Sequence, residues 1–485
     1  MAPFTRWLPA QSDRTSDLII EEAGDGHTDL AKSAIALVQA IADLGFHVMA
    51  QTARADAIGP TSSVRIRVSQ EPIRSMGHGC DVVVYLGQKM PAGNPFHLQR
   101  GSVLIADERC ICEAPPHAMP EGVITYPIPL ARLIRQGGSD SQKGIFTTGI
   151  LAQILGISAE TVRRRLEPDF NRRRFVAGFT WAARHLRKRD IYALPTPPGK
   201  APWQVILNAR QAMVLGLEVG NCGCKGACAE RFKQSPEEWI AEHVNVSWKG
   251  AVSPGGGPLP IPNAYRSSGK GSVVALLDVV DPTKWGAVKS TKGPAVVVAA
   301  DLLDALRLLV TARCQVRAGT PIWVVLDDVV SNWTQSIGVE AIEQVVRKVG
   351  LAVKGTQSSC PYPPELLQGS ERDVDSGSEI GFVGWGASQG VVREAVVLCR
   401  SFGLKVAALY PKVLWPVPRD DLYSFAKTVK RLVVVEPSRD GQYTRLVGSS
   451  TSLRPSSIMP EPGQALTPMD IFLREDLGFK GCPNE

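Results

Sequence analysis

The group of residues best suited to metal or redox chemistry lies in one glycine-rich stretch, GNCGCKGACAE: Cys222, Cys224 and Cys228. This spacing can bring three thiolates together in one turn, but a tetrahedral zinc ion or a cubane cluster needs four ligands. Cys314 or Cys360 could supply the fourth, and the spacing selects neither. Lys225 could instead lower the pKa of a neighbouring thiol and make it nucleophilic. Three interpretations stay open: ordinary loop cysteines, a bound metal or cluster, and a redox or nucleophilic thiol.

Two glycine turns that open helices could bind anions. In FVGWGASQGVVREAV, Gly384 and Gly386 permit a tight turn, and the next residues lie at a helix N-terminus, where free N–H groups and the helix dipole favour an anion. The other turn is GDG, followed by His27, which could contact a phosphate or be an ordinary solvated histidine. Asp25 could also suit a metal by charge, as in thiamine diphosphate sites that pair Gly-Asp-Gly with later asparagines. The region after it, AQTARADAIGPTSS, contains no asparagine.

Length and composition indicate an ordinary globular protein of several domains. A chain of 485 residues predicts about three domains, and its 44% hydrophobic and 21% charged residues are typical of soluble proteins. No window approaches the roughly 18 apolar residues that a membrane span needs. Charged residues within the first twenty interrupt any signal-peptide core. We therefore expect a cytoplasmic protein without a membrane partner, with its ten cysteines reduced.

The order of apolar segments predicts an α/β protein. A helix over residues 27–45 is followed by strands that include the half-exposed SSVRIRVS and the buried run CDVVVYLG. The middle segment begins with an expected helix, QVILNARQAMVLGLEVG. From Ile380 strands and helices alternate, which predicts a parallel, doubly wound sheet. Pro/Gly-rich stretches separate these segments, so we expect domains at 1–192, 193–357 and 380–485, with a linker at 358–379.

A strongly basic block runs from Arg163 to Arg189 and contains ten arginines and lysines. Such a block can bind phosphates, an acidic partner or nucleic acid, or can simply be a solvated face. The stretch LAQILGISAETVRRRL, which contains the first three arginines of this block near its end, is typical of a helix-turn-helix, with the turn at Gly156–Ile157 and a basic recognition helix opening at Thr161. A helix-turn-helix DNA-binding protein is therefore one alternative function.

The C-terminal segment carries the most specific motifs. The glycine turn Gly384–Gly390 opens a helix, Pro416 and Pro418 follow the next strand, and a later strand ends in Glu436, with Gly441–Gln442 after it. In this order they resemble the transketolase-like C-terminal domain in the α chain of 2-oxoacid:ferredoxin oxidoreductases. The N-terminal segment resembles the γ domain of the same enzymes, through ADAIGPTSS and the strand that leads into VRIRVSQEPI. The resemblance is to a fused γ–α subunit.

The middle segment is similar to the thiamine-fold-like, pyrimidine-type first domain of such α chains, in a divergent and shortened form. In the family its first helix leads to a Tyr-Pro-Ile-Thr-Pro loop that faces the thiamine cofactor and the substrate carboxylate. This chain has the cysteine stretch there instead. No complete catalytic set is visible, so the catalytic residues stay unassigned and the chain alone is expected to be inactive.

The resemblance implies a subunit of a complex that oxidatively decarboxylates a 2-oxo acid with CoA as co-substrate. A separate β subunit would hold thiamine diphosphate, Mg²⁺ and an Fe–S cluster, and ferredoxin or another carrier would accept the electrons. A second cluster could bind at the cysteine stretch. Family position suggests these residues for contacts with CoA or its phosphates: Gly24, Asp25, Gly26, His27, Thr61, Ser62, Ser388, Gln389 and Gly390. The resemblance implies a hetero-oligomer without a nucleic-acid partner. A non-catalytic scaffold or repurposed subunit, with a metal or cluster on its cysteines, is the other alternative.

Overall fold

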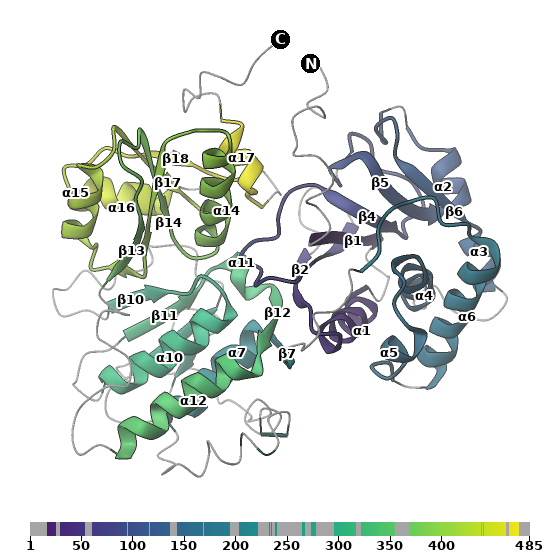
Figure 1. Cartoon of the computed structure of the whole chain (residues 1–485), viewed down its shortest axis with the longest axis horizontal. Coiled ribbons are helices and arrows are strands. Elements are labelled where there is room, and N and C mark those ends of the chain that lie inside the picture. Colours follow the sequence, from purple (N-terminus) through teal and green to yellow (C-terminus); the bar gives the residue numbers. More distant parts are fainter. Residues whose placement is uncertain are drawn as a thin grey trace. The chain divides into compact units, whose positions relative to one another are not determined.

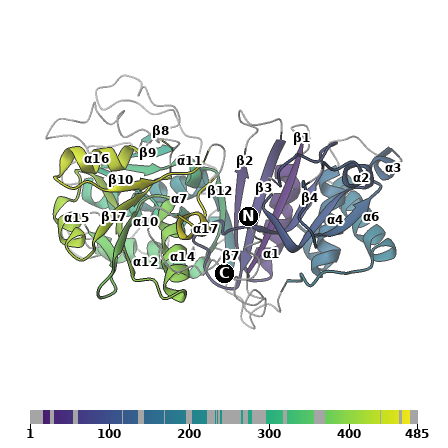
Figure 2. The same cartoon turned by 90° about the horizontal axis from the view of Figure 1, so that it is seen from above.

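The structure is a computed structural model, shown in two views in Figures 1 and 2. It describes residues 17–25, 30–53, 61–94, 96–115, 117–135, 143–167, 169–194, 203–221, 232, 234, 238–239, 264–266, 273–277, 295–316, 322–354, 369–437, 439, 441–461 and 465–474. Contacts divide the chain into two compact units. Unit 1 comprises Met1–Ile206 with Thr334–Ser336, and unit 2 comprises Leu207–Trp333 with Ile337–Glu485.

Unit 1 is built on an eight-stranded sheet of order β6-β5-β4-β1-β3-β2-β12-β7. The strands are β1 (Asp17–Asp25), β2 (His47–Ala53), β3 (Thr61–Ser69), β4 (Cys80–Tyr85), β5 (Leu98–Asp107), β6 (Ile124–Ile128), β7 (Gln204–Asn208) and β12 (Trp333–Gly338). The strands β1, β4, β5 and β6 are parallel to one another, whereas β3 is antiparallel to both β1 and β2. The strands that the sequence predicts at SSVRIRVS and CDVVVYLG are confirmed as β3 and β4.

The helices described in unit 1 are α1 (Leu30–Asp43), α2 (Glu108–Cys112), α3 (Leu130–Arg135), α4 (Lys143–Leu155), α5 (Ala159–Arg163) and α6 (Asp169–His185). The predicted amphipathic helix is confirmed, because Leu37 and Ile41 of α1 belong to a buried core together with Val84 of β4. The neighbouring residue of β4, Val83, belongs to a second core on the opposite face of the sheet. The alternation of side chains along a strand explains this division. The continuous apolar run of β4 is therefore buried on both faces, as its pattern predicts.

Helices α4 and α6 cross in close contact at two glycines. A Cβ atom at Gly149 would lie 2.2 Å from the carbonyl oxygen of Phe175, and one at Gly178 would lie 2.0 Å from the carbonyl oxygen of Phe146. Real Cβ atoms do not approach backbone atoms this closely, so any side chain at either position requires the helices to move apart. The two glycines therefore set the distance between α4 and α6.

We expect Gly178→Ala to lower the free energy of unfolding by about 1–3 kcal/mol, the usual cost of overpacking. In a helix, alanine is about 1 kcal/mol more favourable than glycine. A net loss of stability in this variant must therefore come from the steric clash where α4 and α6 cross. Urea unfolding followed by circular dichroism measures the effect. The matched control is Gly338→Ala, since a Cβ there meets no atom within 4 Å. Equal stability of the two variants would contradict the steric role of Gly178.

The helix that follows the predicted turn is shorter than the helix-turn-helix interpretation requires. Gly156 does form a turn, with φ of +73°, but α5 ends at Arg163 after five residues. Glu167 precedes a proline, which disfavours helical backbone at that residue, so this stretch cannot extend as a helix beyond it. Val162, at the opening of the proposed recognition helix, is fully buried. Within the described residues, this segment has no second helix long enough to lie along a DNA groove.

Unit 2 contains two five-stranded sheets, of order β16-β10-β11-β9-β8 and β13-β15-β14-β17-β18. Its strands are β8 (Ala264–Arg266), β9 (Val273–Leu277), β10 (Ala295–Val298), β11 (Ile322–Leu326), β13 (Ser370–Asp373), β14 (Ile380–Gly384), β15 (Val406–Pro411), β16 (Val413–Trp415), β17 (Arg431–Val435) and β18 (Ser456–Ile458). The helices described in it are α7 (Ala209–Asn221), α10 (Leu302–Val316), α11 (Asp328–Ser331), α12 (Val339–Lys354), α14 (Ser388–Ser401), α15 (Arg419–Ala426), α16 (Gln442–Ser450) and α17 (Pro468–Phe472).

The predicted doubly wound sheet is confirmed at the C-terminal end. The strands β15, β14, β17 and β18 are parallel, and the edge strand β13, within the segment 358–379, is antiparallel to β15. Directly after β15 the chain enters the other sheet, where β16 pairs antiparallel with β10. The two sheets of unit 2 thus share a continuous segment of chain, and the division at residues 358–379 stays a prediction.

The expected helix from Gln204 to Gly220 begins later than predicted. Its first five residues form β7, and the helix α7 starts at Ala209. The Oδ1 atom of Asn208 accepts a hydrogen bond from the Gln211 N–H, and Gln211 Oε1 accepts one from the Asn208 N–H. This reciprocal capping fixes the helix start. Among the described residues, no helix is long and apolar enough to cross a membrane.

Candidate functional site

The C-terminal sheet of unit 2 has a topological switch point at β14. The chain runs from β14 through α14 to β15 on one side, then reaches β17 on the other side of β14. Connections leave β14 and β17 in different directions, and α/β sheets commonly bind ligands beside the carboxyl ends of two such strands. The turn Trp385–Ala387 and the residue Glu436 directly follow these two strands. The predicted anion site at Ser388–Gly390 lies in the first turn of α14 at this position.

The turn after β14 is held by Asp327, which follows β11 of the other sheet. Its Oδ2 accepts a hydrogen bond from the Ala387 N–H at 2.7 Å, and its Oδ1 caps α11 through the N–H groups of Val329 and Val330. Burial raises the pKa of Asp327 to about 7, although these bonds oppose the shift. Gly386 has φ of +54°, and a Cβ there would lie 2.3 Å from Asp327 Oδ2. Glycine is therefore required for the carboxylate to reach the turn.

The hydroxyl of Ser388 is occupied by the backbone around it. It donates to the carbonyl oxygens of Trp385 and Val435 at 2.8 and 2.7 Å, and it accepts from the Trp385 N–H at 3.0 Å. The side chain is buried. Ser388 therefore joins the turn after β14 to the end of β17. Its proposed contact with an anion stays a prediction, and only a rearrangement of these bonds would free the hydroxyl for a ligand.

Two buried side chains flank this connection with polar atoms that find no hydrogen-bond partner among the described residues. They are the amide of Gln389, which is 1% exposed, and the Oε2 atom of Glu436, which is fully buried. The other oxygen of Glu436 accepts two hydrogen bonds of 2.7 Å from the N–H and hydroxyl of Thr444. Burial raises the pKa of Glu436, and hydrogen bonds from Thr444, from the Tyr443 backbone and from the Trp385 side chain oppose the shift. Buried polar atoms without partners are costly, so an ordered water, a ligand or a partner chain fits beside them.

The structure also brings two predicted segments of unit 1 together. Gly24 pairs with Ser62, and Asp25 pairs with Thr61, across the antiparallel β1–β3 ladder. The four residues therefore lie at the same end of the sheet, next to the start of α1. Gly26 and His27 lie outside the described residues. Gly390 is buried in α14. The ligand contacts proposed for all these residues stay predictions.

A buried carboxyl group lies just before the first glycine turn. Glu22 of β1 is 1% exposed, and its Oε2 accepts one long hydrogen bond of 3.3 Å from the Ser33 hydroxyl of α1. Its Oε1 has no hydrogen-bond partner in the described part of the chain. Burial raises the pKa of Glu22 to about 8, and the bond from Ser33 lowers it only in part. Glu22 therefore holds a proton at neutral pH beside the predicted CoA-facing turn.

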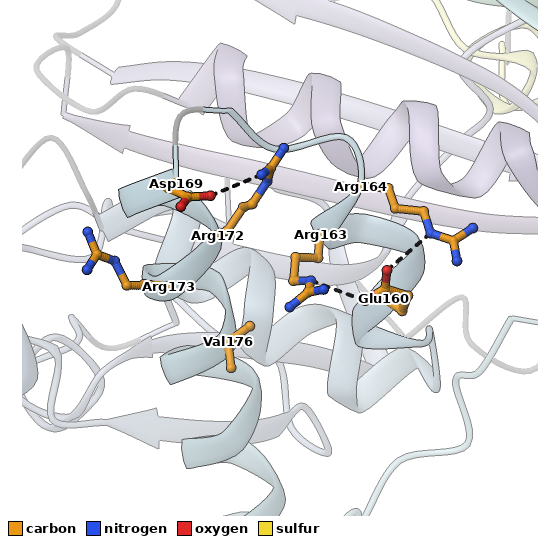
Figure 3. Close-up of a pocket in the computed structure, with 7 residues that line it drawn as sticks. All are labelled: Glu160, Arg163, Arg164, Asp169, Arg172, Arg173 and Val176. Carbon is orange, nitrogen blue, oxygen red and sulfur yellow. Dashed lines mark hydrogen bonds and ion pairs between the residues drawn. The ribbon is translucent and has the colours of Figure 1, made fainter.

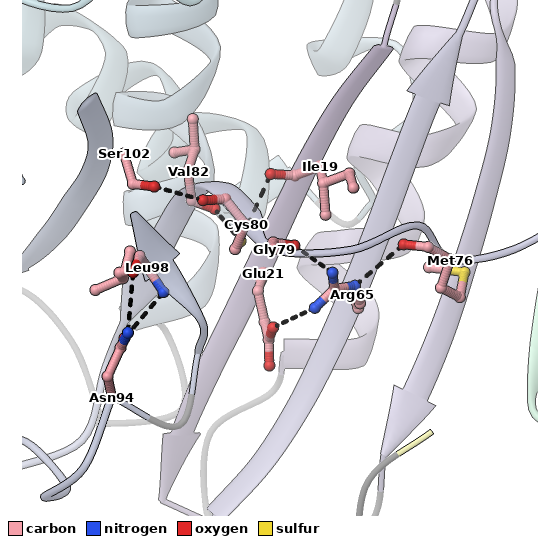
Figure 4. Close-up of polar contacts among 10 residues, drawn as sticks. All are labelled: Ile19, Glu21, Arg65, Met76, Gly79, Cys80, Val82, Asn94, Leu98 and Ser102. Atoms are coloured by element: carbon pink, nitrogen blue, oxygen red, sulfur yellow. Dashed lines mark hydrogen bonds and ion pairs between the residues drawn. The ribbon is translucent and has the colours of Figure 1, made fainter. Parts of the chain in front are cut away.

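The polar face of β3 is less exposed than the alternating pattern predicts. Arg65 forms an ion pair of 3.3 Å with Glu21 and donates to the carbonyl oxygens of Met76 and Gly79 (Figure 4). Arg67 binds Asp17 at 2.6 Å, and its side chain is only 13% exposed. The loop before β4 covers this face of the strand. These arginines therefore stabilise the sheet of unit 1 and are not available as a solvent-facing anion site.

Comparison with known proteins identifies the family. Residues 22–183 match the family model of pyruvate ferredoxin/flavodoxin oxidoreductase, and residues 378–466 match that of pyruvate:ferredoxin oxidoreductase core domain II. A solved chain of 2-oxoglutarate:ferredoxin oxidoreductase from Magnetococcus marinus shares the fold, with a TM-score of 0.69 at 19% identity. The alignment covers 95% of this chain and 99% of that chain. The chain belongs to the 2-oxoacid:ferredoxin oxidoreductase family.

Other family structures resemble parts of this chain. The γ subunit of a keto/oxoacid ferredoxin oxidoreductase from Geobacter sulfurreducens matches 35% of this chain and 97% of its own length, at 19% identity and a TM-score of 0.30. A pyruvate oxidoreductase subunit from Thermotoga maritima matches 34% of this chain and 96% of its own length, at 17% identity and a TM-score of 0.26. No curated protein matched the chain by sequence. The structure of the M. marinus enzyme contains 2-oxoglutarate, coenzyme A and succinyl-CoA.

The predicted cysteine site of this family member lies outside the described residues. Cys222, Cys224 and Cys228 all follow the end of α7. In the described part of the chain no three or more His, Cys, Asp or Glu side chains are grouped to hold a metal ion. Sequence reasoning also missed Asp327 and Glu22 as site residues. Both are acids at or near the end of a buried apolar run, which is the signal that could have found them.

Proposed function

We propose that this chain is a fused γ–α subunit of a complex that carries out CoA-dependent oxidative decarboxylation of a 2-oxo acid. A separate β subunit would hold thiamine diphosphate, Mg²⁺ and an Fe–S cluster, and ferredoxin or a similar carrier would take the electrons. When bound, thiamine diphosphate supplies the carbanion that lets a 2-oxo acid lose CO₂, and a cluster supplies one-electron transfer. The location that fits these steps is the cytoplasm.

Two family models match opposite ends of this one chain, and 95% of the chain aligns with a solved family structure of the same fold. These two findings together carry the proposal. A γ-type match alone would be compatible with a small accessory subunit. The additional match at residues 378–466, to core domain II, supports an α-type domain in the same polypeptide. Both sets of residues proposed to contact CoA, one in each unit, are therefore present in one chain.

The residues of this chain would bind and orient the co-substrate. The Gln389 amide can donate and accept hydrogen bonds, and its buried atoms have no partner among the described residues, so a polar group of a ligand or of the β subunit fits beside it. Glu436 is buried with a raised pKa and can hold a proton on the oxygen that Thr444 does not bind. Asp327 would hold the glycine turn that precedes α14 through its hydrogen bond from the Ala387 N–H. It would thereby position α14 without contacting the ligand.

Purification of the chain from its own organism, with whatever assembles with it, tests the proposal. We expect the chain alone to oxidise no 2-oxo acid, because no complete catalytic set is visible in its sequence. The complex should contain thiamine diphosphate and should reduce methyl viologen with pyruvate, 2-oxoglutarate or a branched 2-oxo acid only when CoA is present. Mass spectrometry of the co-purified chains and a thiamine assay provide the readouts.

A complex that contains no thiamine and shows no CoA-dependent oxidation would refute the enzymatic proposal. It would support the alternative of a scaffold or repurposed subunit, in which family packing persists without 2-oxo acid chemistry. Iron retained by the isolated chain and lost in a Cys222→Ser, Cys224→Ser, Cys228→Ser triple variant would assign a cluster to the cysteine stretch. Iron retained by that variant would exclude these cysteines as its ligands.

A further inference from the structure

An open hollow of about 660 Å³ lies between α5 and the first turns of α6 (Figure 3). Four arginines line it, two from the end of α5 and the turn after it and two from α6, together with Glu160, Asp169 and Val176. None of the candidate site residues belongs to these helices. We propose that this hollow binds an acidic segment of a protein partner that also carries an apolar side chain.

The charges in the hollow are only partly neutralised. Arg163 and Arg164 share the single carboxylate of Glu160, at 3.1 and 3.2 Å. Arg172 pairs with Asp169 at 3.0 Å. Arg173 is exposed and has no ion-pair or hydrogen-bond partner among the residues that the structure describes. Glu167 also pairs with Arg172, at 3.6 Å, so four guanidinium groups meet three carboxylates. The hollow keeps an excess of positive charge that favours an anionic ligand.

The existing ion pairs can be exchanged for new ones at little cost. All of them are solvent-exposed: the side chains of Arg163, Arg164 and Arg172 are 52%, 74% and 37% exposed. Exposed pairs contribute little to stability, because water screens them and long side chains lose entropy when they are held. A carboxylate that enters the hollow can form bidentate bonds with guanidinium groups. Arginine at such a surface is therefore available for recognition.

Apolar side chains beside the arginines favour a protein over other anions. Phe170 is 47% exposed and Val176 is 37% exposed, and both lie on α6 on either side of Arg173. Exposed aromatic and arginine side chains together are typical of protein–protein interfaces. A phosphate ion has no group for Phe170 or Val176 to contact. Duplex DNA presents mainly phosphates, and α5, which ends at Arg163 after five residues, is too short to lie along its groove.

The hollow has a rigid base. Val162 and Phe175, one on each of the two helices, are fully buried in the core of unit 1. Arg165, directly after the lining residues of α5, forms an ion pair of 2.5 Å with Asp43 of α1. The glycine crossing fixes α6 against α4. A partner therefore meets arginines on helices that are already in place, which lowers the entropy cost of binding.

Fluorescence anisotropy with the full-length chain tests the proposal. The probe is a labelled peptide of alternating Glu and Leu, compared with a peptide in which Gln replaces every Glu. We expect the acidic peptide to bind at least tenfold more tightly than the Gln peptide, and more weakly as salt increases. Arg163→Gln with Arg173→Gln should weaken binding at least tenfold, and Phe170→Ser should weaken it several-fold. The matched control is Arg184→Gln, an exposed arginine at the last turn of α6 outside the hollow, which should bind as wild type does.

Two results would overturn the proposal. Equal binding by the Arg163→Gln, Arg173→Gln variant and the Arg184→Gln control would show that the arginines are only a solvated basic face. Tighter binding of a 20-base-pair duplex DNA or of inorganic polyphosphate than of the acidic peptide, lost in the same double variant, would assign the hollow to a phosphate ligand instead. Both results are independent of 2-oxo acid oxidation, so they distinguish this proposal from the proposed function.

Discussion

Glu22→Gln should flatten the pH dependence of stability between pH 5 and pH 8. The unfolded chain releases the Glu22 proton near pH 4.5, whereas burial keeps it bound in the folded protein up to about pH 8. Between these values the folded state binds more protons, so the stability of the wild type falls as pH rises. The full linkage is on the order of 5 kcal/mol, because each pH unit in this window contributes about 1.4 kcal/mol. Glutamine cannot ionise, and the variant therefore avoids this loss.

Urea unfolding at several pH values gives the difference between the two proteins. The amide of glutamine adds a buried N–H group without a partner, which costs about 1–3 kcal/mol at every pH. This offset is constant, so the pH-dependent part of the difference isolates Glu22. Glu340→Gln, at an exposed position in the first turn of α12, is the control and should follow the wild-type curve. Parallel curves for wild type and Glu22→Gln would mean that the carboxylate is ionised and solvated in the folded protein.

The local parts of the fold could be predicted from the sequence. Strand β4 is recognisable because its apolar run is buried on both faces, and α1 because Leu30, Leu37 and Ile41 recur at helical spacing. These signals are local, since neighbouring residues carry them. Strand β12 carries no such signal: its sequence WTQSIG is mixed, and it forms a strand within the sheet of unit 1, where Ser336 Oγ accepts a hydrogen bond from the Val48 N–H. A partner 288 residues away determines that strand.

In the candidate site, too, the features that depend on neighbouring residues could be predicted, and those that depend on distant residues could not. The glycine turn after β14 was predicted because the change from strand to turn to helix is visible within FVGWGASQG. Asp327 could not be assigned to it, because the hydrogen bond to the Ala387 N–H joins residues 60 positions apart. Separation in the sequence also explains the different position of Ser388, which was expected to face an anion. Its hydroxyl instead bonds to the carbonyl oxygen of Val435, a neighbour that only the tertiary fold supplies.

The second large effect is expected when Gln389 is substituted, and it concerns the CoA-dependent activity of the complex. In Gln389→Met, an apolar side chain of similar length replaces an amide that is 1% exposed and has no hydrogen-bond partner among the described residues. A buried polar group without a partner costs about 1–3 kcal/mol, so the free subunit should be at least as stable as wild type. If the amide binds CoA or an adjoining group in the assembled enzyme, the same change removes that contact. We expect the CoA-dependent activity of the complex to fall at least tenfold.

The matched control is Val396→Ala, further along the same buried face of α14. Removing buried methyl groups should lower the melting temperature of the subunit and leave the rate per assembled complex close to that of wild type. The two variants should therefore show opposite patterns of stability and activity. Calorimetry of the free chain and CoA titrations of the complex measure both, and a rise in KM for CoA with a smaller change in kcat would place the amide at the co-substrate. If Gln389→Met instead loses stability and keeps its activity, the amide serves the fold, and the ligand-binding role proposed for the end of β14 fails.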